Sequence, residues 1–256
     1  SPAVIVDGCT LSTAALTVSG LSGIASLAIN AGTITGAPVT NVGAGGALAL
    51  AQDARVTVAV GSLTVMETPG GGRVDLGAGE IIVAAGGISA ADLRADIIAG
   101  RNGGAWTGTT GITSSTAAAS GGTGAVGYLV NGDGSARVSF AVAGDVDLSG
   151  SVNVFDLVSI NSSGKYGTGL ASAWSQGDFN YDGVTNVFDL VAVNTAGTYG
   201  QGNYFPAAPT AVGGVAAVSV PEPAGLGAGI GTACLIGLLR WPGRRMPQGR
   251  QATSAT

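Results

Sequence analysis

Carboxylate and amide side chains recur at fixed spacing in two stretches of this 256-residue chain. Residues 144–167 read GDVDLSGSVNVFDLVSINSSGKYG, and residues 177–200 read GDFNYDGVTNVFDLVAVNTAGTYG. Asp145 and Asp178 lie 33 positions apart, and the same offset aligns the other matching residues, so the two stretches form an internal repeat. Each copy places oxygen-bearing side chains at positions 1, 3, 5, 9 and 12 of a loop with glycine at position 6, which is the spacing of a calcium loop.

Calcium chemistry explains this spacing, because the ion takes six to eight oxygen ligands at roughly 2.3–2.6 Å and alternate residues of a tight loop can point inward together. Gly150 and Gly183 stand where each loop must turn sharply. Position 7 would contribute its main-chain carbonyl, and the Asn at position 9 would bind directly or through water. The predicted ligands are Asp145, Asp147, Ser149, Ser151, Asn153 and Asp156 in the first loop and Asp178, Asn180, Asp182, Val184, Asn186 and Asp189 in the second. Ordinary turns are the alternative, since these residue types also favour turns. Two copies in register favour two bound calcium ions.

The segment NVFDLV follows each loop and has the spacing of a short helix. Val154, Leu157 and Val158 recur at helical intervals, as do their counterparts in the second copy. Gly164 and Gly197 supply the glycine expected just past a helix end. The residues before the first loop alternate like a strand, so the sequence predicts a loop followed by a helix, twice, over residues 144–205.

This arrangement resembles the type I dockerin repeat, in which two calcium loops are each followed by a helix. The resemblance covers residues 144–200 and implies two calcium ions, antiparallel helices, and a cohesin-like or glycan partner in a polysaccharide-degrading system. At positions 10 and 11, where Ser/Thr-type cohesin contacts are common, this chain has Val154-Phe155 and Val187-Phe188. We therefore expect these apolar pairs to pack against the neighbouring repeat or the β domain.

Residues 1–143 have the composition of a glycine-rich β domain. The chain contains 46 glycines, while aromatic residues make up 5% and charged residues 10% of it, which indicates a thin core of small side chains. Short runs of alternating or β-branched residues are separated by turn residues; they cover 3–6, 15–18, 25–29, 47–50, 56–60, 62–66, 74–76 and 81–84. Such runs form a parallel β-solenoid or an antiparallel sandwich. We expect the solenoid, because LTVSG, LAINAGTITG and VDLGAGEIIVAAGG, within residues 1–142, resemble the strand repeats of autotransporter-like surface proteins.

Three other features of the β domain could carry chemistry. A helix is predicted near residues 89–99, where Asp92 and Asp96 are either a catalytic carboxylate pair or, as we expect, part of a solvated face. Trp106 lies in a Gly/Asn-rich loop and either stacks on a sugar or closes one end of the core, the second being the expectation. Asp133 belongs to the turn of a predicted hairpin and not to a third metal loop.

The composition also excludes several classes of function. The chain has no histidine, which removes histidine general bases, Ser-His-Asp and Cys-His triads, and histidine metal sites. Of its ten basic residues, four lie at or after Arg240, so the part before them is distinctly acidic, and we expect no nucleic-acid binding. Six of the 15 acidic residues stand in the two loops, which leaves few carboxylates elsewhere for acid–base catalysis.

The C-terminal part differs from the rest. Residues 206–219 have the composition of a linker. The following segment, 220–256, contains an apolar run over residues 224–239. As a helix this run would be about 24 Å long, which is shorter than the bilayer core of about 30 Å. The order of VPEP, apolar run and arginine cluster resembles the PEP-CTERM sorting signal; its residues here are Val220, Pro221, Glu222, Pro223, Arg240, Arg244 and Arg245. This resemblance implies export, a membrane anchor at 224–239 and processing by an exosortase-type membrane protease. A buried apolar helix is the alternative.

These observations favour a mainly β, exported, calcium-stabilised and non-catalytic protein of the cell surface or extracellular matrix. The alternative is a carbohydrate-binding or accessory component of a secreted polysaccharide-degrading system. If the chain is an enzyme, we expect an O-glycosyl hydrolase-type component.

Overall fold

The computed structural model describes residues 3–20, 26–66 and 70–206 of the chain. The predicted sorting signal, including the apolar segment 224–239, lies outside the described residues. Within the described part, no helix is both long and apolar enough to cross a membrane.

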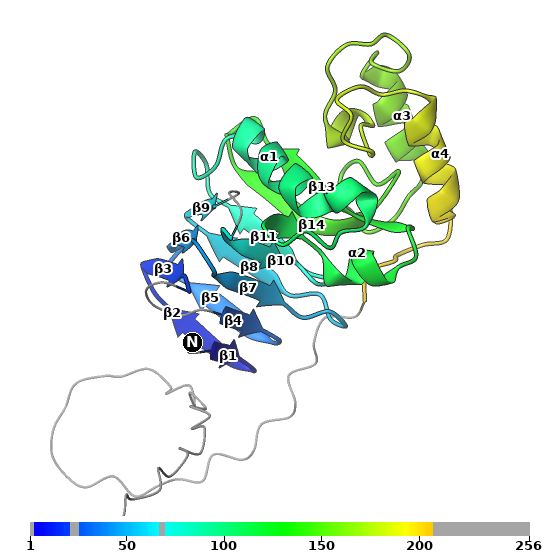
Figure 1. The fold of residues 1–256 in the computed structure, drawn as a ribbon. Helices are drawn as coiled ribbons and strands as arrows, with labels where there is room; N and C mark the ends of the chain where they lie inside the picture. Colours follow the sequence, from blue (N-terminus) through cyan, green and yellow to red (C-terminus); the bar gives the residue numbers. More distant parts are fainter. Residues whose placement is uncertain (1–2, 21–25, 67–69, 207–256) are drawn as a thin grey trace, which may run out of the picture.

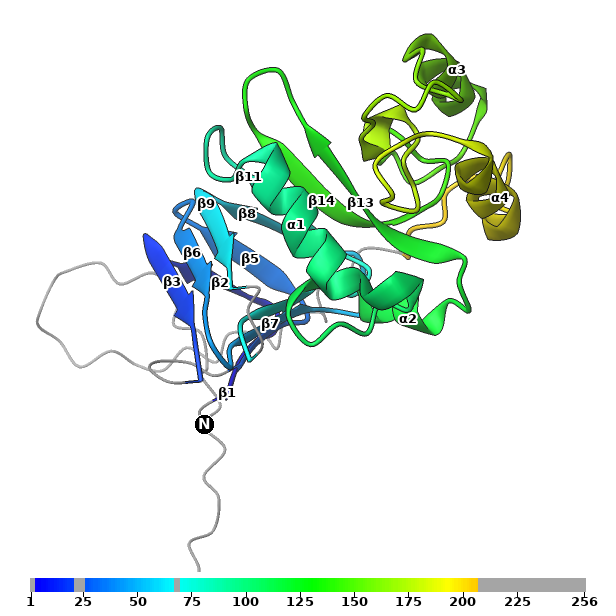
Figure 2. The same ribbon diagram turned by 45° about the horizontal axis from the view of Figure 1, so that its top comes forward.

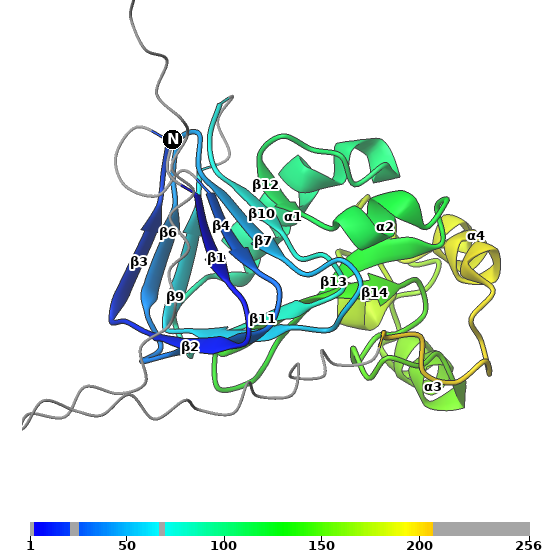
Figure 3. The ribbon, with the colours of Figure 1, turned by 90° about the horizontal axis from the view of Figure 1, so that it is seen from below.

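The protein is mainly β, and its first half is a parallel β-solenoid with three walls (Figure 1). Three coils contribute one strand to each wall: β1 Ala3–Val6, β2 Cys9–Ser12 and β3 Ala15–Val18; β4 Ser26–Ile29, β5 Gly32–Thr35 and β6 Val39–Val42; β7 Ala47–Leu50, β8 Thr57–Val60 and β9 Ser62–Val65. A fourth coil begins with β10 Arg73–Asp75 and β11 Glu80–Val83. Seen along the stack in Figure 3, the walls enclose a triangular core. The parallel pairing excludes the sandwich.

In-register stacking explains how small residues fill this core. In the first wall, which pairs β1, β4, β7, β10 and β12 (Gly111–Thr113), Leu27 lies opposite Leu48, and Leu48 lies opposite Val74. Each of these side chains is buried, so one aliphatic column runs through successive coils. Glycine is required where coils approach closely, since a Cβ at Gly46 would clash with the Val18 carbonyl of the coil before it. The strands missed from the sequence, β2, β5, β6 and β12, are rich in Gly, Thr or Ser.

The end of the solenoid that leads into the repeats is closed by a helix and a hairpin (Figure 2). Helix α1, Ala90–Arg101, confirms the helix predicted near 89–99, and its N-cap Ser89 accepts a hydrogen bond from the Asp92 N–H at 3.0 Å. The hairpin consists of β13 Gly124–Val130 and β14 Ala136–Val142, and β14 pairs antiparallel with β11. In its turn, Asp133 accepts a hydrogen bond from the Ser135 N–H at 2.8 Å, as expected of a hairpin residue. The short elements η1 Asn102–Gly104 and α2 Ser115–Ala119 complete this end.

The repeats follow directly and pack on the hairpin. They form α3 Val154–Ser162, η2 Trp174–Gln176 and α4 Val187–Ala196. Trp174 is fully buried, and its Nε1–H donates to the Asp145 carbonyl at 2.8 Å. The absence of a side chain at Gly127 of β13 makes room for it, because a Cβ there would collide with Trp174 and Leu148. The repeats are therefore one packed unit with the solenoid end.

Candidate metal centre

The two loops share one backbone conformation. The fourth residue of each, Leu148 and Tyr181, has positive φ (55° and 62°), and so has the glycine at position 6, with 91° at Gly150 and 95° at Gly183. Glycine adopts this conformation without steric cost, whereas other residues rarely do. Leu148 and Tyr181 are both buried, so the unusual turn at position 4 serves to place a side chain in the core beneath each loop.

The carboxylate at position 12 joins each loop to its helix. Asp156 accepts hydrogen bonds from the N–H groups of Asn153 at 2.9 Å and Val146 at 3.0 Å. Asp189 makes the same bonds to Asn186 and Phe179, both at 2.8 Å. These contacts form a capping box at the first turn of α3 and of α4. Each NVFDLV segment is a helix, as predicted, because the loop itself supplies the cap.

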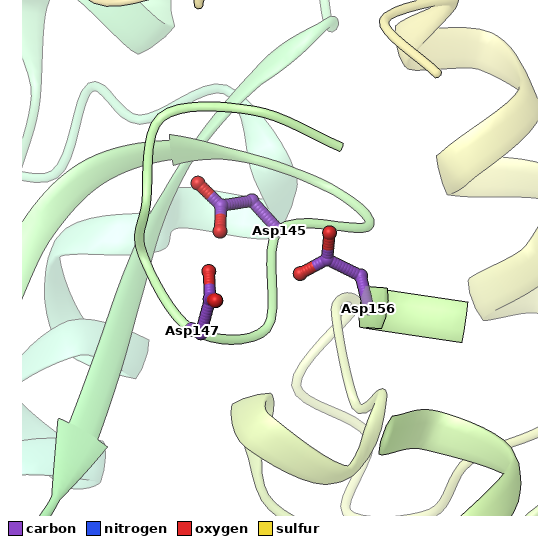
Figure 4. A group of neighbouring side chains, drawn as sticks. All are labelled: Asp145, Asp147 and Asp156. Atoms are coloured by element: carbon purple, nitrogen blue, oxygen red, sulfur yellow. The ribbon is translucent and has the colours of Figure 1, made fainter. Parts of the chain in front are cut away.

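Three carboxylates converge in the first loop. Figure 4 shows Asp145, Asp147 and Asp156 directed toward one another, and one oxygen from each lies within 4.8 Å of the others. Two ligands on opposite sides of a calcium ion are separated by at most about 5.2 Å, so these oxygens can bind the same ion. Asp145 and Asp156 are buried, whereas Asp147 is exposed, which leaves the ion a route to solvent. The donor set, hard oxygens only, fits calcium.

The remaining predicted ligands of the first loop lie around the same turn. The Ser149 hydroxyl donates to the Ser151 carbonyl at 3.3 Å, which places positions 5 and 7 side by side. Asn153 accepts a hydrogen bond from the Phe155 N–H at 2.8 Å through its Oδ1. That oxygen is therefore already engaged in capping α3, which fits a ligand that reaches the ion through water.

Burial controls the acidity of these carboxyl groups. Burial raises the pKa of the Asp145 carboxyl to about 6, although hydrogen bonds from the Tyr204 hydroxyl and the Gly150 N–H oppose the shift. Burial also raises the pKa of Asp156 and of Asp189. At Asp147, burial acts in the same direction, but hydrogen bonds with Asp145 and Ser149 outweigh it and hold the pKa below its usual value. A bound dication would favour the ionised form of all of them.

The second loop brings its predicted ligands together less closely, because among the described residues only the first loop has three carboxylates that converge. Asn180 Nδ2 donates to Asp182 Oδ2 at 2.9 Å, and Asn186 Nδ2 donates to the same oxygen at 3.3 Å. The N–H of Val184, whose carbonyl is the predicted ligand at position 7, donates to Asp182 Oδ1 at 3.0 Å. Asp178 Oδ2 accepts from the Gly183 N–H at 3.1 Å, while its Oδ1 is buried without a hydrogen-bond partner. An orphaned buried carboxylate oxygen is costly unless a cation binds it.

Residues far along the chain complete these loops, and the sequence did not predict their contacts with the loop carboxylates. The Tyr204 hydroxyl donates to Asp145 Oδ2 at 2.5 Å, and Phe205 packs where a side chain at position 6 of the loop would lie. From α1, Arg94 reaches Asp178. The aromatic pair Tyr204-Phe205 was a recognisable apolar signal in the sequence, whereas Arg94 carried none.

The structure contradicts one prediction about the repeats. Val154-Phe155 and Val187-Phe188 were expected to pack against the neighbouring repeat or the β domain, but Phe155 is 75% and Phe188 67% exposed. The reason is geometric: positions 10 and 11 fall in the first helical turn, next to the cap, and project away from the buried residues at positions 4 and 12.

The other candidate residues of the β domain differ in their exposure. Trp106 is 3% exposed and contacts Tyr181 edge-on, with ring centroids 6.3 Å apart, so it closes the core end as expected and is not available to stack on a sugar. Asp92 is exposed, but Asp96 is buried, so the expectation that both lie on a solvated face is wrong for Asp96. Packing of α1 against the last coil buries the side of the helix that carries Asp96.

No family model, curated protein or solved structure matches the chain.

Proposed function

We propose that the protein is a calcium-stabilised, non-catalytic component of the cell surface or extracellular matrix, in which the repeats bind two calcium ions. The convergence of Asp145, Asp147 and Asp156 carries this proposal. Clustered carboxylates repel one another when ionised, so the ion would stabilise the fold. The dockerin-like repeat pattern over residues 144–200 supports two ions.

The charges of the β domain support a structural role for it. Glu80 is buried and pairs with Arg55 at 2.8 Å and with Arg137. Asp75 is also buried and pairs with Arg73 at 2.7 Å. Glycoside hydrolysis needs two carboxylates that face a shared substrate, and an arginine partner removes each of these groups from that role. These ion pairs favour a scaffold over an O-glycosyl hydrolase.

Calcium-dependent thermal stability tests the proposal. With 1 mM calcium and a Kd near 10 µM, each site would add about 2.7 kcal/mol, which raises Tm by roughly 5–10 °C in a domain of this size. Asp156→Ala combined with Asp189→Ala should abolish the difference in Tm between calcium and chelator. Because both carboxylates also cap helices, the readout is that difference within the variant, not its absolute Tm.

The matched control removes two carboxylates outside the loops, Asp92→Ala with Asp133→Ala, and should keep the full calcium response. If the wild-type melting curve were identical with calcium and with chelator, the calcium proposal would be wrong.

A second candidate function is docking of a protein partner of the cohesin type, as an accessory component of a polysaccharide-degrading system. The specific observation is the exposure of Phe155 and Phe188, at the positions that contact cohesins in the dockerin repeats this chain resembles. Calorimetry against a panel of purified cohesin modules tests it. Binding that requires calcium and is lost in Phe155→Asp with Phe188→Asp is the expected result, and no binding by the wild type to any module contradicts it.

A further inference from the structure

The two loops differ in what stands beside the carboxylate at position 1. In the first loop, the neutral hydroxyl of Tyr204 donates to Asp145. In the second loop, the guanidinium of Arg94 lies at that place, with Nη2 3.2 Å from Asp178 Oδ2 and 2.8 Å from the Tyr181 carbonyl. Arg94 belongs to α1 of the β domain, so a cation from outside the repeat is held inside its second loop.

This ion pair is partly shielded from water. The Asp178 side chain is 1% exposed and that of Arg94 28%, and the guanidinium carbon lies 5.9 Å from the centroid of the Tyr181 ring. Burial raises the pKa of Asp178, and Arg94 opposes that shift. Asp178 Oδ1 has no hydrogen-bond partner, so one oxygen of the carboxylate remains for a ligand while Arg94 holds the other.

We propose that Arg94 is a built-in cation of the second loop, which makes this loop the weaker of the two calcium sites. The inference rests on the proposed calcium binding and adds an order of binding to it. A calcium ion in the second loop would share Asp178 with the guanidinium, which would repel the ion at close range. Because the ion pair is partly buried, solvent and salt screen this repulsion only weakly. Among the described residues, no cation forms an ion pair with a carboxylate of the first loop, because Arg55, which interacts with Asp145, is paired with Glu80. The first loop therefore fills first.

Calcium titration of the full chain by calorimetry tests this order, because the heats resolve sites of different affinity. The wild type should show two steps at least about tenfold apart, since even 1.4 kcal/mol of repulsion gives that ratio. Arg94→Gln, which removes the charge but keeps much of the side chain, should strengthen the weaker step by about tenfold or more and leave the tighter step unchanged. Arg94→Lys, which keeps the charge, should stay close to the wild type.

Loop-specific backgrounds assign the steps. Asp147→Ala removes an exposed predicted ligand of the first loop, and Asp182→Ala removes one of the second; neither carboxylate accepts a capping hydrogen bond of α3 or α4. The effect of Arg94→Gln should persist in Asp147→Ala and disappear in Asp182→Ala. Arg101→Gln is the matched control, because it makes the same charge change on the same helix at a residue without an ion pair among the described residues. Arg101 lines a cavity with Asn180 but does not contact Asp178, so its replacement should strengthen the weaker step much less than Arg94→Gln does.

Two results would overturn the inference and differ from a failure of the proposed function. Two equal affinities in the wild type, or unchanged affinities in Arg94→Gln, would leave calcium binding intact and remove the role of Arg94. The absence of calcium binding in the wild type and in Arg94→Gln would reject both. The wild-type titration needs no variant, so the inference stays testable if Arg94→Gln fails to fold.

Discussion

At the scale of single residues, Asp145 forms hydrogen bonds both within the first loop and with residues outside it. It is buried, it accepts hydrogen bonds from Ser149 and Gly150, and its carbonyl is held by Trp174. Its pKa of about 6 in the metal-free protein lies above the ordinary value of a carboxyl group, because burial disfavours the charged form. An ionised, buried Asp145 at neutral pH is a strong ligand for a cation.

This pKa predicts a pH dependence of calcium binding. Between about pH 4 and pH 6 the folded, metal-free protein holds a proton on Asp145 that the unfolded chain has released, so this group's contribution to stability falls as pH rises through that window. Calcium must displace this proton. The calcium affinity of the first loop should therefore be close to its maximum at pH 7 and about tenfold weaker at pH 5, one unit below the pKa of Asp145.

Titration of the Asp182→Ala variant at both pH values measures the effect, because the first loop alone keeps its ligands there. Equal affinities at pH 5 and pH 7 would contradict this prediction and remove either the raised pKa of Asp145 or its role as a ligand.

At the scale of elements, the repeats are held on the hairpin by side chains that come from the loops themselves. Leu148 and Tyr181 point into the core at position 4 of each loop, and the Tyr181 hydroxyl donates to the Val126 carbonyl of β13 at 2.6 Å. Trp174 packs between them and the hairpin, with its ring centroid 4.9 Å from that of Phe179. The loops thus bind the solenoid end on one side and present their ligands on the other.

We expect Trp174→Ala to destabilise the protein by about 3–5 kcal/mol, the usual cost of deleting a large buried aromatic side chain. Denaturant unfolding in saturating calcium measures the change. Phe155→Ala serves as the comparison, because this exposed side chain should contribute within about 0.5 kcal/mol. Similar losses in the two variants would mean that the repeats do not depend on the hairpin contact.

At the scale of the whole molecule, the coil stack, its helical cap and the two loops form a continuous core. Buried residues run from Val6 in the first coil to Ala196 at the end of α4. An open solenoid end would expose apolar columns to water, and α1 with the hairpin covers the end nearest the repeats. Calcium in the loops would therefore stabilise a part of the molecule that also closes the solenoid.

The predicted sorting signal can be tested with the whole chain in a bacterial cell that has an exosortase-type protease. The wild type should be exported and appear in the envelope or medium in a shortened form. Glu222→Ala should accumulate as a longer, membrane-associated form, because the apolar residues 224–239 and the arginines after them would remain attached. Immunoblots of fractionated cells measure this, with Asp53→Ala as the control. Identical sizes and locations of wild type and Glu222→Ala would reject the sorting role.

The sequence by itself determined the features that repeat locally. The predicted ligands of each loop, the helix after it and most strands of the first wall depend on residues 2 to 12 positions apart. Over such distances, neighbouring side chains and backbone turns decide the conformation. The aliphatic columns follow from the same regularity, because parallel coils of similar length place like residues opposite one another. Strands such as β2 and β5 were missed because their short, Gly- and Ser/Thr-containing segments read as turns.

Only the tertiary structure decided how these parts meet. Arg94 and Asp178 are 84 residues apart, and Tyr204 and Asp145 are 59 apart, so no local pattern could pair them. The same holds for exposure: the sequence shows Val154-Phe155 as apolar, which suggested burial, but the direction of these side chains depends on which face of α3 the loop anchors. Spacing along the chain fixes which atoms a loop can offer to an ion, whereas the packing of distant elements fixes the charge and the neighbours that the ion would meet.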